Sequence, residues 1–150
     1  MDNNSWGTKI WNFFHTLAEK ISDQQFLDNR TKILELIKES CNYLPCPKCT
    51  SHSQYTLNYA LYNKILSKDD LKIFLLQFHN LVNLKNNKSP FTRALLEEKY
   101  SKFEFKNTIN SFISVYNLPN RTNNLNIGMK KKAFLEKFIP FIKHLTIIIN

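Results

Sequence analysis

Two cysteines separated by two residues, Cys46 and Cys49, form a C-x-x-C motif, and His52 follows three positions later. A pair at this spacing has two common uses in proteins, which are reversible disulfide exchange and zinc binding. As a redox pair, it changes between dithiol and disulfide when a thiolate attacks one of the two sulfurs. A new helical pattern begins at about Thr50, and the dipole at a helix N-terminus lowers the pKa of a nearby thiol. The local sequence therefore favours redox chemistry, although a C-x-x-C motif alone is only moderately specific.

The overall composition indicates one all-α domain. The chain has 150 residues, of which 43% are hydrophobic, and it contains only 2 Gly and 5 Pro, with no recurring strand–turn–strand pattern. Three cysteines are too few, and an odd number, for the disulfide framework of a secreted domain. Neither a signal peptide nor a membrane-spanning run is visible. We therefore expect a soluble protein in a reducing compartment, where a C-x-x-C pair is more often catalytic or metal-binding than structural.

The net charge of +9 is compatible with binding to nucleic acid or to anionic membranes. The lysines, however, are spread along the chain rather than clustered, which is typical of a general compositional bias. The run Lys130–Lys132 is the exception, and such a run is usually a solvated helix start. A basic binding module is therefore an added property at most, and we do not expect a nucleic-acid partner.

Apolar side chains recur at three- and four-residue spacing along most of the chain, as they do in amphipathic helices. Ser67 and the Ser89–Pro90 pair have the composition of helix starts, and Pro140 should kink or break the last helix. In the third helix, Tyr55 is expected to face inward. The predicted helices are Trp6–Ile21, Asp28–Leu44, Thr50–Leu66, Ser67 to Leu84, Ser89 to Tyr100, Phe105 to Tyr116, and Phe134 to Leu145.

Two further groups of residues have types suited to binding a ligand. Trp11 and His15 are four residues apart, and so lie on one face of the first helix. His79, Asn80 and Asn83 lie beside the apolar stripe of the fourth helix, where an unsatisfied buried polar group costs roughly 1–3 kcal/mol. These side chains therefore indicate a bound polar ligand, although each group taken alone is also compatible with ordinary core or solvated positions.

Together the three motifs resemble the Erv/ALR family of FAD-dependent sulfhydryl oxidases, in particular the compact members encoded by large DNA viruses. The resemblance covers Trp6 to about Tyr100. It implies a four-helix core plus a short fifth helix in residues 1–102, holding FAD non-covalently and usually dimeric, with residues 103–150 as a helical extension. The motifs are Trp6-Gly7-x-x-x-Trp11-x-x-x-His15, Cys46-x-x-Cys49-x-x-His52, and His79-Asn80-x-Val82-Asn83 followed by Lys88.

The resemblance also implies roles for individual residues. Cys46 would face the incoming substrate, and Cys49 would lie against the flavin ring. No resident metal is expected. The residues that would line the FAD are Trp6, Trp11, His15, Cys49, His52, Tyr55, His79, Asn80, Val82, Asn83 and Lys88.

The implied reaction is disulfide formation in protein dithiols, with electrons passing from the cysteine pair through FAD to oxygen and hydrogen peroxide released. Cys41 is the one cysteine outside the C-x-x-C motif, so the chain lacks the second, shuttle pair that many cellular relatives carry. The substrate is therefore a protein dithiol that reaches Cys46 directly, or a thioredoxin-like relay protein. A homodimer in the host cytoplasm at virus assembly sites, or in the virion, is the corresponding expectation.

A zinc site is the main alternative. Cys41, Cys46, Cys49 and His52 provide a Cys₃His ligand set within a short span. Against this reading, Cys41 lies on the apolar stripe of the second helix, and zinc leaves the other two motifs unexplained. Residues 103–150 lie outside the resemblance, and their apolar stripes favour packing onto the bundle over a dimer interface or a partner-docking surface.

Overall fold

Residues 5–59, 64–118 and 125–149 are described by the computed structural model, and within these ranges every regular element is a helix. The all-α fold expected from the sequence is therefore confirmed. None of the helices in these ranges has the length and apolar composition needed to cross a bilayer. The elements are α1 (Trp6–Lys20), α2 (Asp23–Ser40), the 3₁₀ turn η1 (Cys41–Tyr43), α3 (Pro47–Tyr59), α4 (Lys68–Lys85), α5 (Arg93–Ser101), the 3₁₀ turn η3 (Phe105–Thr108), α6 (Ile109–Tyr116) and α7 (Leu125–Ile149).

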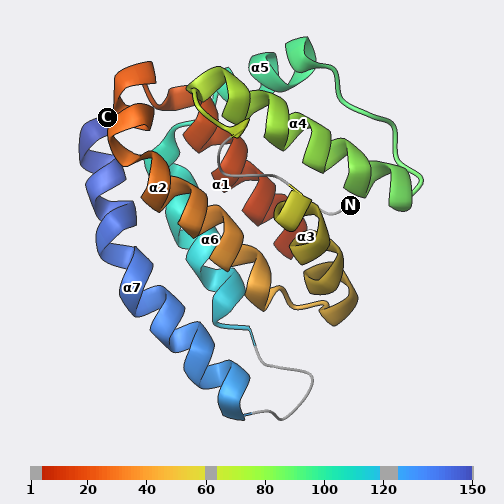
Figure 1. Cartoon of the computed structure of the whole chain (residues 1–150), viewed down its shortest axis with the longest axis vertical. Helices are drawn as coiled ribbons and strands as arrows, with labels where there is room; N and C mark the ends of the chain where they lie inside the picture. Colours follow the sequence, from red (N-terminus) through yellow and green to blue (C-terminus); the bar gives the residue numbers. More distant parts are fainter. Residues whose placement is uncertain (1–4, 60–63, 119–124, 150) are drawn as a thin grey trace.

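Helix α1 lies at the centre of the bundle, in contact with α4, α5 and α6 (Figure 1). Its inward face holds Phe13, Phe14 and Leu17, which are almost completely excluded from solvent. Full burial of side chains of this size stabilises a fold by about 1.5–3 kcal/mol each. The chemistry-bearing residues of α1, Trp11 and His15, are therefore carried on a helix that the core holds rigidly.

Side-chain caps set the start of several helices. The Ser5 hydroxyl accepts a hydrogen bond from the Thr8 N–H at the start of α1, and the Ser67 hydroxyl caps α4 in the same way. Such a cap stabilises a helix by about 1 kcal/mol. Helix α2 begins earlier than the predicted Asp28, because Ser22 and Gln25 form a reciprocal capping box.

Helix α4 ends in a tight turn that sets the position of the chain that follows. The Lys88 N–H donates to the Asn83 carbonyl at 2.8 Å, and the Asn87 N–H donates to the Leu84 carbonyl at 3.3 Å. Asn87 has a φ of 55°, the left-handed conformation that Asn tolerates better than most residues. The predicted helix start at Ser89–Pro90 is wrong, because residues 88–92 after this turn are not helical, and α5 begins at Arg93 with Thr92 as its cap.

Helix α3 starts and ends earlier than predicted. It begins at Pro47 rather than Thr50, so both cysteines lie at its first turn. Ile65 and Leu66, which were predicted to be helical, are not, and residues 60–63 lie outside the described residues. The inward orientation predicted for Tyr55 is also wrong, because its side chain is 63% exposed.

Within the C-terminal extension, residues 103–118 and 125–149 pack onto the bundle, as their apolar stripes predicted. The rings of Phe13 in α1 and Phe112 in α6 are stacked at 3.9 Å, and Leu145 in α7 is completely buried. Helix α7 runs along the outer edge of the molecule beside α2 and α6 (Figure 1). Of the kink or break predicted at Pro140, the break is not seen, because α7 continues through this residue to Ile149, with buried Phe138 and Phe141 on either side of it.

Candidate functional site

Cys46 and Cys49 are joined by a disulfide at the N-terminus of α3, with their Cα atoms 5.1 Å apart. Cys46 is the residue immediately before the helix, and the Cys49 N–H donates to its Sγ at 3.2 Å. The free N–H groups and the dipole of the helix N-terminus therefore point at Cys46, an environment that favours a thiolate. Both cysteines are half-buried, which leaves the pair within reach of a reagent in solution.

Trp11, His15 and His79 form a stack of flat rings between α1 and α4. The Trp11 and His79 rings are nearly parallel, at 6° and 4.1 Å between centroids. His15 Nε2 and His79 Nδ1 share a hydrogen bond of 2.9 Å. Burial, followed by the charges of Lys99 and Lys88, lowers the pKa of His79 to about 4, and burial is the main cause that holds the pKa of His15 well below its ordinary value. At neutral pH both imidazoles are uncharged, and one donates the shared hydrogen bond while the other accepts it.

Two lysines lie near this ring stack. Lys99 in α5 is over the rings of Phe91 and Tyr100, at 5.6 and 5.3 Å from their centroids. The Phe91 ring under Lys99 is 4.9 Å from the His79 ring between centroids, and after burial the charges of Lys99 and Lys88 lower the pKa of His79. Across the described ranges neither lysine forms an ion pair. Two uncompensated cations beside neutral rings make a site suited to an anion.

His52 connects α3 to the end of α4. Its Nδ1 accepts a hydrogen bond of 2.9 Å from the Lys85 ammonium group, while its Nε2 is buried and has no partner. Burial, followed by the charge of Lys85, lowers the pKa of His52. His52 is one turn beyond Cys49, on the same face of α3.

A cavity of about 340 Å³ lies between α3 and α4, within the usual size range of small-molecule sites. Phe78 belongs to its wall, and the same ring meets Trp11 edge-on at 5.1 Å between centroids. The cavity therefore adjoins the ring stack. Its lining residues are Thr56, Lys64, Ile65, Asp70, Ile73, Phe74, Gln77, Phe78 and Leu81.

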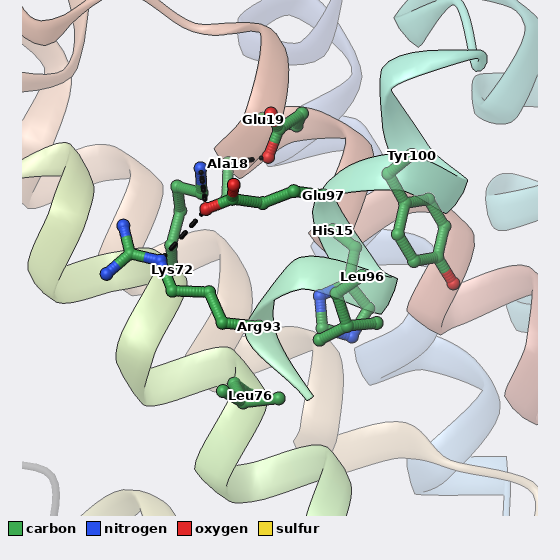
Figure 2. A pocket seen from close by; sticks show the side chains of 9 residues that line it. All are labelled: His15, Ala18, Glu19, Lys72, Leu76, Arg93, Leu96, Glu97 and Tyr100. Atoms are coloured by element: carbon green, nitrogen blue, oxygen red, sulfur yellow. Dashed lines mark hydrogen bonds and ion pairs between the residues drawn. The ribbon is translucent and has the colours of Figure 1, made fainter. Parts of the chain in front are cut away.

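A second, much smaller pocket is lined by His15 and by a network of charged side chains (Figure 2). Its volume of about 20 Å³ is enough for one water molecule. Lys72 in α4 pairs with Glu19 in α1 at 3.1 Å and with Glu97 in α5 at 2.9 Å, and Arg93 also bonds Glu97. This network fastens α5 to the bundle, and so holds Tyr100 and Lys99 beside the ring stack.

The predicted site residues do not all converge. Asn80 binds the backbone of Phe91 with both ends of its amide, at 2.9 and 2.8 Å, so it secures the segment before α5. Tyr55 points to solvent. Trp6 and Val82 are half-buried against the core, Asn83 is buried, and Lys88 is exposed.

Sequence reasoning missed two residues of the site, Lys85 and Lys99. Lys85 is two residues after Asn83, within the third motif, and this proximity was the available signal. Lys99 lies in no motif, and only the packing of α5 across α1 and α4 brings it to His79.

The zinc alternative is not supported. Cys46 and Cys49 are joined to each other, and Cys41 is buried in the core. Within residues 5–59, 64–118 and 125–149, no group of three or more His, Cys, Asp or Glu side chains is arranged to hold a metal ion.

Comparison with known proteins gives one family match and several viral relatives. The model of the Erv1 / Alr family matches residues 8–101. A protein of Invertebrate iridescent virus 3 whose name describes an FAD-linked sulfhydryl oxidase is 27% identical over 101 residues, covering 67% of this chain and 68% of that protein. The FAD-linked sulfhydryl oxidases of two African swine fever virus isolates, from a warthog in Namibia and a pig in Kenya, are each 31% identical over 85 residues, covering 55% of this chain and 69% of theirs. No solved structure matches the chain significantly.

Proposed function

The chain belongs to the Erv1/Alr family, and on this premise we propose that it is an FAD-linked sulfhydryl oxidase whose redox-active pair is Cys46–Cys49. The viral relatives are named FAD-linked sulfhydryl oxidases, and the proposed substrates of this chain are protein dithiols, in which it forms disulfides. One observation supports these residue roles above all others. The disulfide is at a helix N-terminus, in the same bundle as a stack of neutral rings and two lysines that form no ion pair within the described ranges.

The residues present fit FAD. The parallel rings of Trp11 and His79 provide a surface for stacking on a flat heterocycle. Lys88 and Lys99, whose charges act on His79, supply the positive charge that a pyrophosphate needs. The buried side chain of Asn83 can both donate to and accept from the polar edge of a ring. The cavity between α3 and α4 provides volume beside these groups.

The chain's own residues carry out the thiol chemistry. A substrate thiolate attacks Cys46 Sγ, the Cys46–Cys49 bond breaks, and the electron pair of that bond leaves on Cys49. The second substrate thiolate then attacks the mixed disulfide, which releases an oxidised substrate and leaves Cys46 as a thiolate facing the helix N–H groups. The chemistry that bound FAD would supply is the acceptance of the two electrons of the reduced Cys46–Cys49 pair and their transfer to oxygen, with hydrogen peroxide as the product.

Cys41 takes no part in this exchange. It is 2% exposed, and burial raises the pKa of its thiol to about 12. A protein dithiol or a thioredoxin-like relay partner therefore meets Cys46 directly. The proposal includes a homodimer, which the family resemblance implies. The relatives are proteins of viruses, and the proposed place of action is the host cytoplasm or the virion.

An absorption spectrum of the purified protein tests the proposal. We expect flavin bands, their bleaching by dithiothreitol without oxygen, and oxygen consumption with release of hydrogen peroxide in air. Light scattering during gel filtration tests the dimer. Colourless protein that carries stoichiometric zinc would contradict the proposal.

A further inference from the structure

The contact between Lys85 and His52 determines which nitrogen of the imidazole carries its proton. The Lys85 ammonium group can only donate, and its Nζ is 2.9 Å from His52 Nδ1. Nδ1 is therefore the acceptor, and the neutral ring carries its proton on Nε2. Both burial and the neighbouring cation favour the neutral ring.

The Nε2–H donor that results is buried and has no hydrogen-bond partner. Such groups are rare in native proteins, and each calls for an explanation. The structure holds the Cys46–Cys49 pair as a disulfide, in which neither sulfur carries a charge. Reduction places a negative charge on a sulfur one helical turn before His52. Helical side chains lean toward the preceding turn, so the His52 ring leans toward the turn that holds Cys49.

We propose that the His52 Nε2–H is the hydrogen-bond donor to the Cys49 thiolate, and that Lys85 is the positioning residue that keeps the proton on Nε2. When a substrate sulfur bonds to Cys46, the disulfide bond breaks and its electron pair leaves on Cys49 Sγ. No proton moves in this step, and the donor that had no partner then gains one. Each sulfur then has its own donor: Cys46 Sγ accepts from the Cys49 N–H, and in this proposal the Cys49 thiolate accepts from His52 Nε2–H. The inference rests on the proposed function only in taking Cys46 as the sulfur attacked.

Titration of a single thiol tests the proposal. The background is the full-length Cys46→Ser protein, because serine keeps the helix cap and leaves Cys49 as the accessible thiol. Cys41 does not interfere, because its pKa is raised to about 12. The ultraviolet absorbance of the thiolate is recorded against pH, with FAD bound and after FAD is removed, in this background alone and with Lys85→Met, His52→Phe, Lys85→Arg or Lys143→Met added.

Lys85→Met and His52→Phe should each raise the Cys49 pKa by about one unit, a tenfold change in its acid dissociation constant. The double variant should raise the Cys49 pKa little more than either single change, because both changes remove the same interaction. Lys85→Arg keeps a cationic donor and should retain most of the effect. Lys143→Met removes an exposed charge on α7, on the far side of the bundle from α3, and should leave the pKa unchanged (Figure 1).

A second measurement needs no variant. Long-range proton–nitrogen NMR correlations on the oxidised protein should show His52 as the Nε2–H tautomer, and Lys85→Met should produce a mixture of tautomers. An Nδ1–H tautomer in the unaltered protein would overturn the proposal. If neither Lys85→Met nor His52→Phe changes the Cys49 pKa, the proposal is overturned as well. This holds even if the variants bind FAD more weakly, since His52 would then act on the cofactor and not on Cys49. If the purified protein lacks flavin but these pKa shifts are found, the proposed function fails and this inference stands.

Discussion

Cys41 and the Cys46–Cys49 pair are five residues apart in the sequence, and they lie in two regions with opposite chemical properties. Cys41 opens the turn η1, with its sulfur enclosed by the core and near the Ser53 hydroxyl, and burial raises its pKa from the ordinary 9.0 to about 12. The pair is at the N-terminus of α3, half-buried, with a backbone N–H directed at Cys46.

Since all three residues carry the same thiol, their different reactivity is decided by the backbone around each sulfur and by its access to water. A thiol becomes a nucleophile only as a thiolate, which a helix N-terminus stabilises and an apolar core destabilises. The two regions can therefore be separated by experiments that change one and leave the other intact.

The largest expected effect comes from removing the second cysteine of the pair. Cys49→Ser should lower dithiol oxidation by at least about a thousandfold, because no disulfide can then form at α3. Oxygen uptake with dithiothreitol measures the rate, and circular dichroism checks that the helices remain. Full oxygen uptake by this variant would show that the redox centre lies elsewhere.

Alkylation of the reduced protein should separate the two regions directly. At neutral pH, iodoacetamide should modify the cysteines of α3 about a thousandfold faster than Cys41, because the thiolate fraction of Cys41 is very small and its sulfur is enclosed. Mass spectrometry of peptides, taken over time, gives both rates. Modification in denaturant, where all three should react alike, is the control.

The buried thiol also predicts a loss of stability at high pH. Folding raises the pKa of Cys41, so the contribution of this thiol to the free energy of unfolding is fully present below the unfolded pKa of 9.0. That contribution is lost as the pH rises toward the folded pKa of about 12. Buried Tyr116, whose pKa is also raised, adds to the same trend. Urea unfolding between these pH values should show a smaller decrease in the free energy of unfolding for Cys41→Ala than for the unaltered chain.

The smallest effect should be that of Cys41→Ala on turnover. Dithiothreitol oxidation should stay within about twofold of the unaltered protein, because the variant changes packing and not the sulfurs of the exchange. A large loss of rate with an unchanged melting temperature would show that Cys41 takes part in electron transfer. It would contradict the division between a reactive pair and an inert core thiol.

Much of the site could be predicted from short-range patterns. The C-x-x-C pair at a helix N-terminus, the shared face of Trp11 and His15, and the position of Lys88 near His79 follow from spacing along one or two segments. The errors arose where a local signal met a competing one. Ser89–Pro90 resembles a helix start, but the turn after α4 and the bonds between Asn80 and Phe91 hold that segment in a non-helical conformation.

The helical class, the main capping residues and the two thiols at the start of a helix could be predicted from the chain alone, because each depends on groups a few residues apart. Four other features depend on the packed structure: the charge of Lys99 acts on His79, Lys85 bonds His52, Tyr55 faces water and α7 continues through Pro140. These outcomes depend on which helices pack together. Helix packing is set by the fit of the whole core, and the period of a single segment does not contain that information.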